Sequence, residues 1–155
     1  MNKIQIDKLI QLLQKYELSI AVLYETFASI LTSSKNTWMA FSKEERIHAK
    51  WIGALHTQLK KENISFEQTK FTAQSTKLAI DYVEKQAEQA IQNRPDLMQS
   101  LNIAINIEKS LLESAFLSVF KLTGPKTQKI QTRLKEATKS HINKLIEWRT
   151  DIMKT

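Results

Sequence analysis

Cysteine is absent from this sequence, and glycine and proline occur only twice each among 155 residues. The lack of cysteine excludes disulfide bonds, thiolate metal sites and thiol nucleophiles. Because turn-forming residues are so scarce, an all-helical domain is favoured over a domain of many strands. No apolar run approaches the roughly 18 residues of a membrane-spanning helix, and the first residues contain no apolar signal core. We therefore expect one cytoplasmic domain over residues 1–155, with no membrane partner.

Acidic charge is also in the minority, because 16 Asp and Glu stand against 23 Lys and Arg, for a formal net charge of +7. A basic balance can indicate contact with nucleic acid or anionic lipid. Here the basic residues are spread along the whole chain and form no dense block. The pattern therefore favours an ordinary basic surface, and we expect no nucleic-acid partner.

Apolar residues that recur at three- and four-residue steps predict helices over residues 4–31, 37–62, 72–93, 96–122 and 126–153. In the first helix they form one stripe, made of Leu9, Leu12, Leu13, Tyr16, Ile20, Leu23, Tyr24, Phe27 and Leu31. The apolar side of the shorter third segment carries Ala73, Ile80, Val83, Ala87 and Ile91. Polar residues predict a loop over 32–37, and Pro95 and Gly124–Pro125 mark the later breaks, with Pro95 suited to the first turn of a helix.

These lengths predict two long helical hairpins joined by a long connection. That topology is an all-α four-helix bundle with one crossover, and the segment 72–93 would lie along the crossover as an extra helix. A plain bundle with a fifth packing helix would show the same apolar stripes, so the topology alone does not indicate a function.

Five ionisable residues fall inside the apolar stripes, at about 100° of rotation per residue. They are Glu17, Glu45, His48, Glu108 and His141. Three other acids point away from the stripes of their helices and are expected on the surface: Glu25, Glu113 and Glu136. Glu44 lies at the margin, where it could support the inward residues.

The same five residues are also expected at one depth. Counted from the loops near Ser34 and Gly124, and with both loops taken to lie at the same end, they fall within roughly 9 Å of one another along the bundle. Three buried carboxylates repel each other and cost several kcal/mol each to desolvate unless cations compensate them. Carboxylate and imidazole together suit iron, manganese or zinc, so the pattern predicts a buried metal site.

The arrangement of these residues resembles the rubrerythrin-like branch of the ferritin superfamily. The resemblance rests on Glu17 with Tyr24 seven residues later, on Glu45-Arg46-Ile47-His48, and on Ala104-Ile105-Asn106-Ile107-Glu108. It implies a ferritin-like bundle with two iron ions, a homodimer, and an oxidoreductase that handles peroxide or iron. It further implies that Glu45 bridges the metals, that Glu17 and His48 hold one ion, and that Glu108 and His141 hold the other. Tyr24 would be a nearby hydrogen-bond donor or redox-active phenol, although a core aromatic with a satisfied hydroxyl explains it as well.

The fourth helix departs from the family pattern, because Thr138 stands where a glutamate is expected three residues before His141. With three carboxylates instead of four, two divalent ions would leave about one excess positive charge. The chain also lacks the cysteine-rich iron domain of rubrerythrins, so redox turnover would need a separate electron donor. Two hypotheses follow: a di-metal oxidoreductase, or a non-enzymatic structural or interaction bundle with a reduced, single-metal or vestigial site. Thr138 favours the second.

Overall fold

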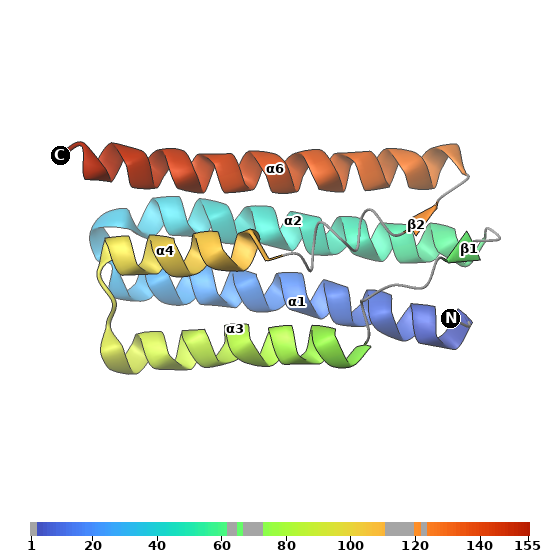
Figure 1. Cartoon of the computed structure of the whole chain (residues 1–155), viewed down its shortest axis with the longest axis horizontal. Helices are drawn as coiled ribbons and strands as arrows, with labels where there is room; N and C mark the ends of the chain where they lie inside the picture. The colour runs from blue at the N-terminus through green and yellow to red at the C-terminus, as the bar shows by residue number, and fades with distance from the viewer. Residues whose placement is uncertain (1–2, 62–64, 67–72, 111–119, 122–123) are drawn as a thin grey trace.

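A computed structural model of the protein describes residues 3–61, 65–66, 73–110, 120–121 and 124–155 (Figure 1). The elements are α1 (Lys3–Ile30), the 3-10 turn η1 (Thr32–Ser34), α2 (Lys35–Leu59), β1 (Ser65–Phe66), α3 (Ala73–Asn93), α4 (Leu97–Glu108), β2 (Phe120–Lys121) and α6 (Pro125–Met153). Apart from the short strand pair, these elements are helical, which confirms the predicted all-α class. None of the helices in these ranges is both long and apolar enough to cross a membrane.

The helices lie side by side, and each runs along the long axis of the molecule (Figure 1). α1 packs along α2 and α3, and α6 packs along α2 and α4. The chain turns from α1 into α2 at one end of the molecule, whereas β1, which follows α2, pairs with β2, which precedes α6, at the other end. α2 and α4 therefore run in the same direction, and α3 carries the chain back between them on the outer side of α1, as expected for the segment 72–93.

The connections that precede α2 and α6 thus lie at opposite ends, so the expectation that they share one end is wrong. The polar residues nevertheless meet at one level, because Glu17, Glu45 and His141 lie near the middle of long helices. Near the middle of a helix, depth counted from either end gives nearly the same answer.

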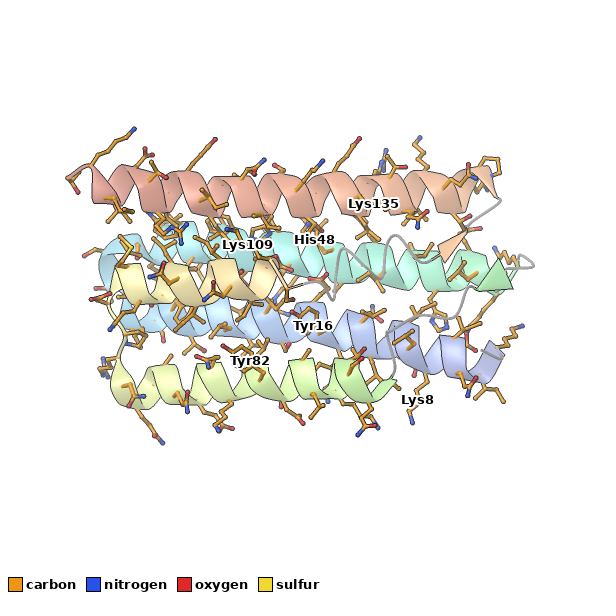
Figure 2. All side chains as sticks on the ribbon, in the orientation of Figure 1. Lys8, Tyr16, His48, Tyr82, Lys109 and Lys135 are labelled. Carbon is orange, nitrogen blue, oxygen red and sulfur yellow. The ribbon has the colours of Figure 1, made fainter. Side chains whose placement is uncertain are left out.

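Buried apolar side chains form two clusters. The smaller one joins the start of α1 to the end of α2 and contains Ile6, Leu9, Ile10, Leu13, Ile52, Leu55, Leu59 and Leu134. The larger one contains Tyr24, Trp38 and Leu145, together with residues of α3 and α4. The lysines labelled in Figure 2 are all exposed and lie on different parts of the molecule: Lys8 on α1, Lys109 directly after α4 and Lys135 on α6. They agree with a dispersed basic surface.

Local chemistry explains where α4 and α6 begin. The Gln99 backbone N–H donates to Asp96 Oδ1 at 2.8 Å, and the Asp96 N–H donates to Gln99 Oε1 at 3.0 Å, which is a reciprocal capping box. Pro95 therefore precedes the cap and does not stand in the first helical turn. Pro125 does occupy the first turn of α6, where a missing N–H has no cost.

The helix predicted over 96–122 is wrong at its C-terminal end. α4 ends at Glu108, and Phe120–Lys121 pair as a strand with Ser65–Phe66. Apolar periodicity cannot reveal this pairing, because its partner is distant in sequence. Residues 111–119 lie outside the described residues. They include Glu113 and four apolar residues that helical spacing predicts on the inner face of the 96–122 helix, namely Leu111, Leu112, Ala115 and Val119.

Two smaller expectations also differ from the structure. α2 already begins at Lys35, so the predicted loop 32–37 is reduced to η1. Ile91 of α3 is 61% exposed, and Ala90, at 3%, takes the inward position instead. Ala90 lies seven residues after Val83, which is also buried, so the two share one face of α3.

Arg94, which follows α3, has a φ of 44°, in the left-handed region that glycine adopts most readily. We expect Arg94→Gly to raise the free energy of unfolding by about 1 kcal/mol, because it removes the Cβ strain of that conformation. Urea denaturation measures this difference. Arg94→Ala is the matched control, since it removes the same side chain but keeps the Cβ; equal gains in both variants would contradict the explanation.

Candidate metal centre

A layer of polar side chains lies between the two apolar clusters. It contains all five residues that the sequence places inward, contributed by α1, α2, α4 and α6: Glu17, Glu45, His48, Glu108 and His141. Each is at most 4% exposed. The face assignment is therefore confirmed as regards burial, and the five are brought to one level.

Three of these residues converge closely. Ligand atoms of Glu45, His48 and His141 all lie within 4.8 Å of one another. Glu45 Oε1 is 2.9 Å from His141 Nδ1, and Glu45 Oε2 is 3.6 Å from His48 Nδ1. Glu45 and His48 meet because they are three residues apart on α2, which puts both on one helix face. Each oxygen of the central carboxylate thus faces a different histidine.

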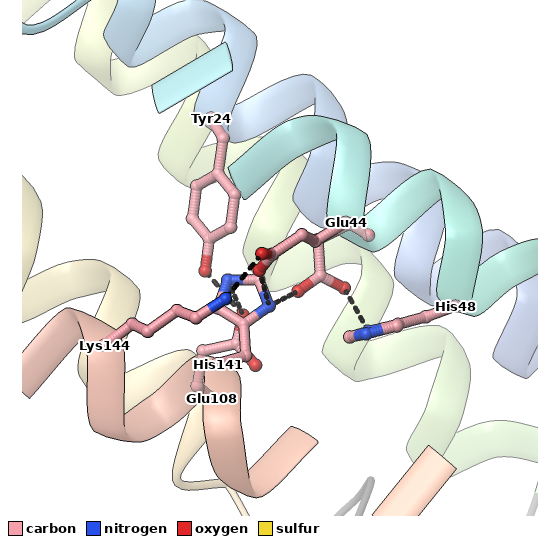
Figure 3. A network of polar contacts seen from close by, with 7 residues as sticks. Tyr24, Glu44, His48, Glu108, His141 and Lys144 are labelled. Atoms are coloured by element: carbon pink, nitrogen blue, oxygen red, sulfur yellow. Dashed lines mark hydrogen bonds and ion pairs between the residues drawn. The ribbon is translucent and has the colours of Figure 1, made fainter. Parts of the chain in front are cut away.

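The other two acids border this group. Glu108 Oε1 lies 3.7 Å from His141 Nε2 and accepts a hydrogen bond of 2.6 Å from the Tyr24 hydroxyl (Figure 3). Glu17 is 1% exposed, and its side chain lowers the pKa of the Glu45 carboxyl. The layer therefore holds three carboxylates and two imidazoles in mutual contact.

Burial by itself would raise the pKa of the Glu45 carboxyl. The side chains of Glu17, His141 and His48, together with the positive charge of His141, outweigh burial and hold this pKa well below its usual range. The ionised form of Glu45 is therefore the favoured one at neutral pH, even though the group is fully buried.

Several of these buried atoms lack well-aligned hydrogen bonds. Within the described residues, both Glu45 oxygens and both ring nitrogens of His141 have no hydrogen bond of good geometry, although the Glu45–His141 separation is short. Buried polar atoms are nearly always satisfied, so such a concentration calls for an additional partner. Carboxylate oxygens and imidazole nitrogens are ligands that iron, manganese and zinc accept, so these residues fit a metal ion.

Thr138 lies on α6, one turn before His141, and is 6% exposed. It thus faces inward at the place where the family pattern expects a glutamate. Glu44 is the nearest additional carboxylate: its Oε2 is 3.6 Å from His141 Nδ1, and its Oε1 accepts from Lys144 Nζ at 2.9 Å. The sequence placed Glu44 at the margin but missed Lys144, whose only signal is its position three residues after His141.

Of the three acids expected on the surface, the two that belong to the described residues lie outside the layer. Glu136 is exposed. Glu25 is half-buried, binds Arg46 at 2.7 Å and accepts from the Ser42 hydroxyl at 3.0 Å, so it is a partner in an ion pair between α1 and α2. Glu113 belongs to the undescribed residues.

Aromatic rings cover one side of the layer. Phe41 stacks on His141 with ring centroids 4.8 Å apart, and Tyr24 packs on Trp38 at 5.5 Å. Trp38 in turn contacts Trp148 at 4.9 Å. Trp38 is fully buried, and Trp148 is partly buried against the same apolar cluster. Tyr24 is fully buried and its hydroxyl donates to Glu108, a contact that is compatible with both interpretations of this residue and does not separate them.

No protein family, curated protein or solved structure matches this chain significantly. The resemblance to rubrerythrins therefore rests on the residue pattern of the sequence alone.

The lowered pKa of Glu45 predicts how the stability of the metal-free protein depends on pH. A group whose folded pKa lies below its usual value of about 4.5 stabilises the fold above that value, and the contribution is lost as the pH falls through the lower, folded value. We expect wild type to exceed Glu45→Gln in unfolding free energy at pH 7, and this difference to shrink below about pH 4.5. Chemical denaturation between pH 7 and pH 4 measures it. Glu44→Gln serves as the control on a more exposed neighbour, and a difference that grows toward acid pH would contradict the assignment.

Proposed function

We propose that this protein binds divalent transition metal in the buried layer, as a ferritin-like bundle of the rubrerythrin kind. The observation that carries the proposal is the convergence of Glu45, His48 and His141, whose ligand atoms lie within 4.8 Å of one another and are buried. The Glu45 oxygens and the His141 ring nitrogens also lack hydrogen bonds of good geometry. A divalent cation would satisfy these atoms and offset the repulsion among the three carboxylates.

The geometry supports a particular division of the ligands. Glu45 turns one oxygen toward each histidine, so its carboxylate would be shared between the two ions. Glu17 and His48 would hold one ion, and Glu108 and His141 the other. The parallel course of α2 and α4, with α3 as the return crossover, supports the ferritin-like topology.

Iron in this layer would supply redox chemistry, and we infer peroxide or iron handling as the activity. The protein's own contribution is a buried site in which the Phe41 ring stacks on His141 and the Tyr24 hydroxyl holds Glu108 in place. We further infer a homodimer and a separate electron donor from the family resemblance.

The alternative is a non-enzymatic bundle that keeps a single or vestigial metal site. The observation that favours it is buried Thr138, which leaves the Glu108 and His141 side with fewer ligand atoms than the Glu17, Glu45 and His48 side. Stoichiometry separates the two proposals, because the enzyme version needs two ions.

Metal content is the first test. Protein purified without chelator is expected to carry one or two equivalents of iron or manganese, measured by mass spectrometry of the metal. Metal at 100 times its dissociation constant should raise the unfolding free energy by about 2.7 kcal/mol, and chelator should abolish that gain. Two equivalents, with peroxide consumption in the presence of an added reductant, support the enzyme, and one inert equivalent supports the alternative.

The matched variants for this test are Glu45→Gln, which removes the central ligand charge, and Glu136→Gln, which makes the same change at an exposed position of α6. Only the first should lose metal. A wild-type protein that carries no metal, and whose stability chelator leaves unchanged, would sink both versions.

Replacing Thr138 tests the missing ligand. In the absence of metal, Thr138→Glu should destabilise the protein by several kcal/mol, because it adds a fourth buried carboxylate to the layer. With metal in excess, the same variant should bind closer to two equivalents and regain its stability. Denaturation with and without metal, combined with metal analysis, measures both effects.

Thr132→Glu, at an exposed position of the same helix, is the control and should change neither quantity appreciably. If Thr138→Glu is equally stable with and without metal and binds no more of it, position 138 does not face the metals.

A further inference from the structure

A pocket of about 240 Å³ opens between α2 and α6. Its lining includes Glu44, His48 and Trp51 from α2 and Ala137, Ser140 and Lys144 from α6. On each helix these positions recur at three- and four-residue steps, so they follow the seam between the two helices. Ala137 and Ser140 are small, which leaves space that longer side chains would fill.

The pocket borders directly on the polar layer. His48 lines the pocket and, on its other side, approaches Glu45 at 3.6 Å. Glu44 also lines it and lies 3.6 Å from His141 Nδ1. Figure 3 shows Lys144 and His141 meeting at Glu44, so one carboxylate separates the surface lysine from the buried histidine. Molecules in the pocket are thus one side chain away from the candidate metal ligands.

The ion pair between Glu44 and Lys144 at the opening of the pocket can be replaced by other partners. The Glu44 and Lys144 side chains are 33% and 54% exposed, and their ion pair of 2.9 Å is worth little in water. An incoming anion can take the place of Glu44 on the Lys144 ammonium, because the released carboxylate remains solvated. Ser140 adds a hydroxyl that can donate a hydrogen bond.

Charge indicates what the pocket would take. Two divalent ions among the carboxylates of Glu17, Glu45 and Glu108 leave about one positive charge, since Thr138 contributes none. One monovalent anion would balance it. The volume is below the range typical of drug-sized ligands, so the anion should have only a few heavy atoms.

We propose that a small monovalent carboxylate or oxyanion enters the layer through this pocket, binds Lys144 and Ser140, and supplies the charge that is missing at Thr138. The inference rests on the proposed function, because the excess charge exists only when metal is bound. The competing explanation is a packing gap between two helices, closed by a surface ion pair.

Cobalt(II) provides a readout that does not depend on activity. The visible spectrum of the cobalt-loaded protein reports metal binding by itself, and its change on titration with azide or formate reports anion binding. We expect a saturable change, and Lys144→Met should weaken the apparent affinity by about tenfold, since a charge-assisted hydrogen bond is lost. Lys139→Met removes the same charge from an exposed position that does not line the pocket, and should leave the affinity unchanged.

Two further tests separate entry of the anion through the pocket from attraction by the overall charge of the layer. Ser140→Phe fills the pocket and should slow anion binding while leaving the cobalt spectrum intact; Ala137→Leu replaces it if the phenylalanine variant does not fold. Thr138→Glu supplies the missing charge and should weaken anion binding although Lys144 is still present.

The outcomes distinguish the two proposals. Absence of any cobalt spectrum overturns the metal-binding function and this inference with it. A cobalt spectrum that neither anion changes, or an anion response that Lys144→Met and Lys139→Met alter equally, overturns the anion pocket alone and leaves the metal site standing.

Discussion

The structure depends on one electrostatic constraint, which is that three carboxylates and two imidazoles are buried in a single layer. Moving an ionised carboxylate out of water costs several kcal/mol unless partners compensate it. Glu45 meets this cost through contacts with Glu17, His48 and His141, which keep its pKa low despite complete burial. The apolar clusters on either side exclude water from the layer, and that same exclusion makes a bound cation effective as compensation.

The layer is not symmetrical. Glu17, Glu45 and His48 come from the packed pair α1 and α2, whereas Glu108 and His141 come from α4 and α6. On α6, Thr138 is buried at the position where the rubrerythrin-like pattern would have a glutamate. The nearest substitute, Glu44, stands at the rim and is bound to Lys144. The two proposals are therefore linked: two divalent ions in the layer would leave one excess positive charge, and an anion in the pocket would offset it from the surface.

Helical periodicity was a good guide wherever a helix ran long and unbroken. It placed α6 within one residue at its start, and it separated Glu17, which is buried, from Glu25, which binds Arg46 outside the layer. It failed where the decision was not local. Phe120 and Lys121 fall within the helix predicted over 96–122 yet pair as a strand with Ser65 and Phe66. In α3, the predicted inward residue Ile91 is exposed and its neighbour Ala90 is buried.

The sequence by itself determined the helical class and which ionisable residues face inward, because both follow from a rotation of about 100° per residue that each helix carries alone. Only the tertiary structure decided how those residues meet. Whether Glu45 reaches both histidines, whether Tyr24 binds Glu108, and whether Glu44 pairs with Lys144 depend on the spacing and rotation of separate helices. Those quantities are set by side-chain packing between helices, which no single stretch of sequence contains.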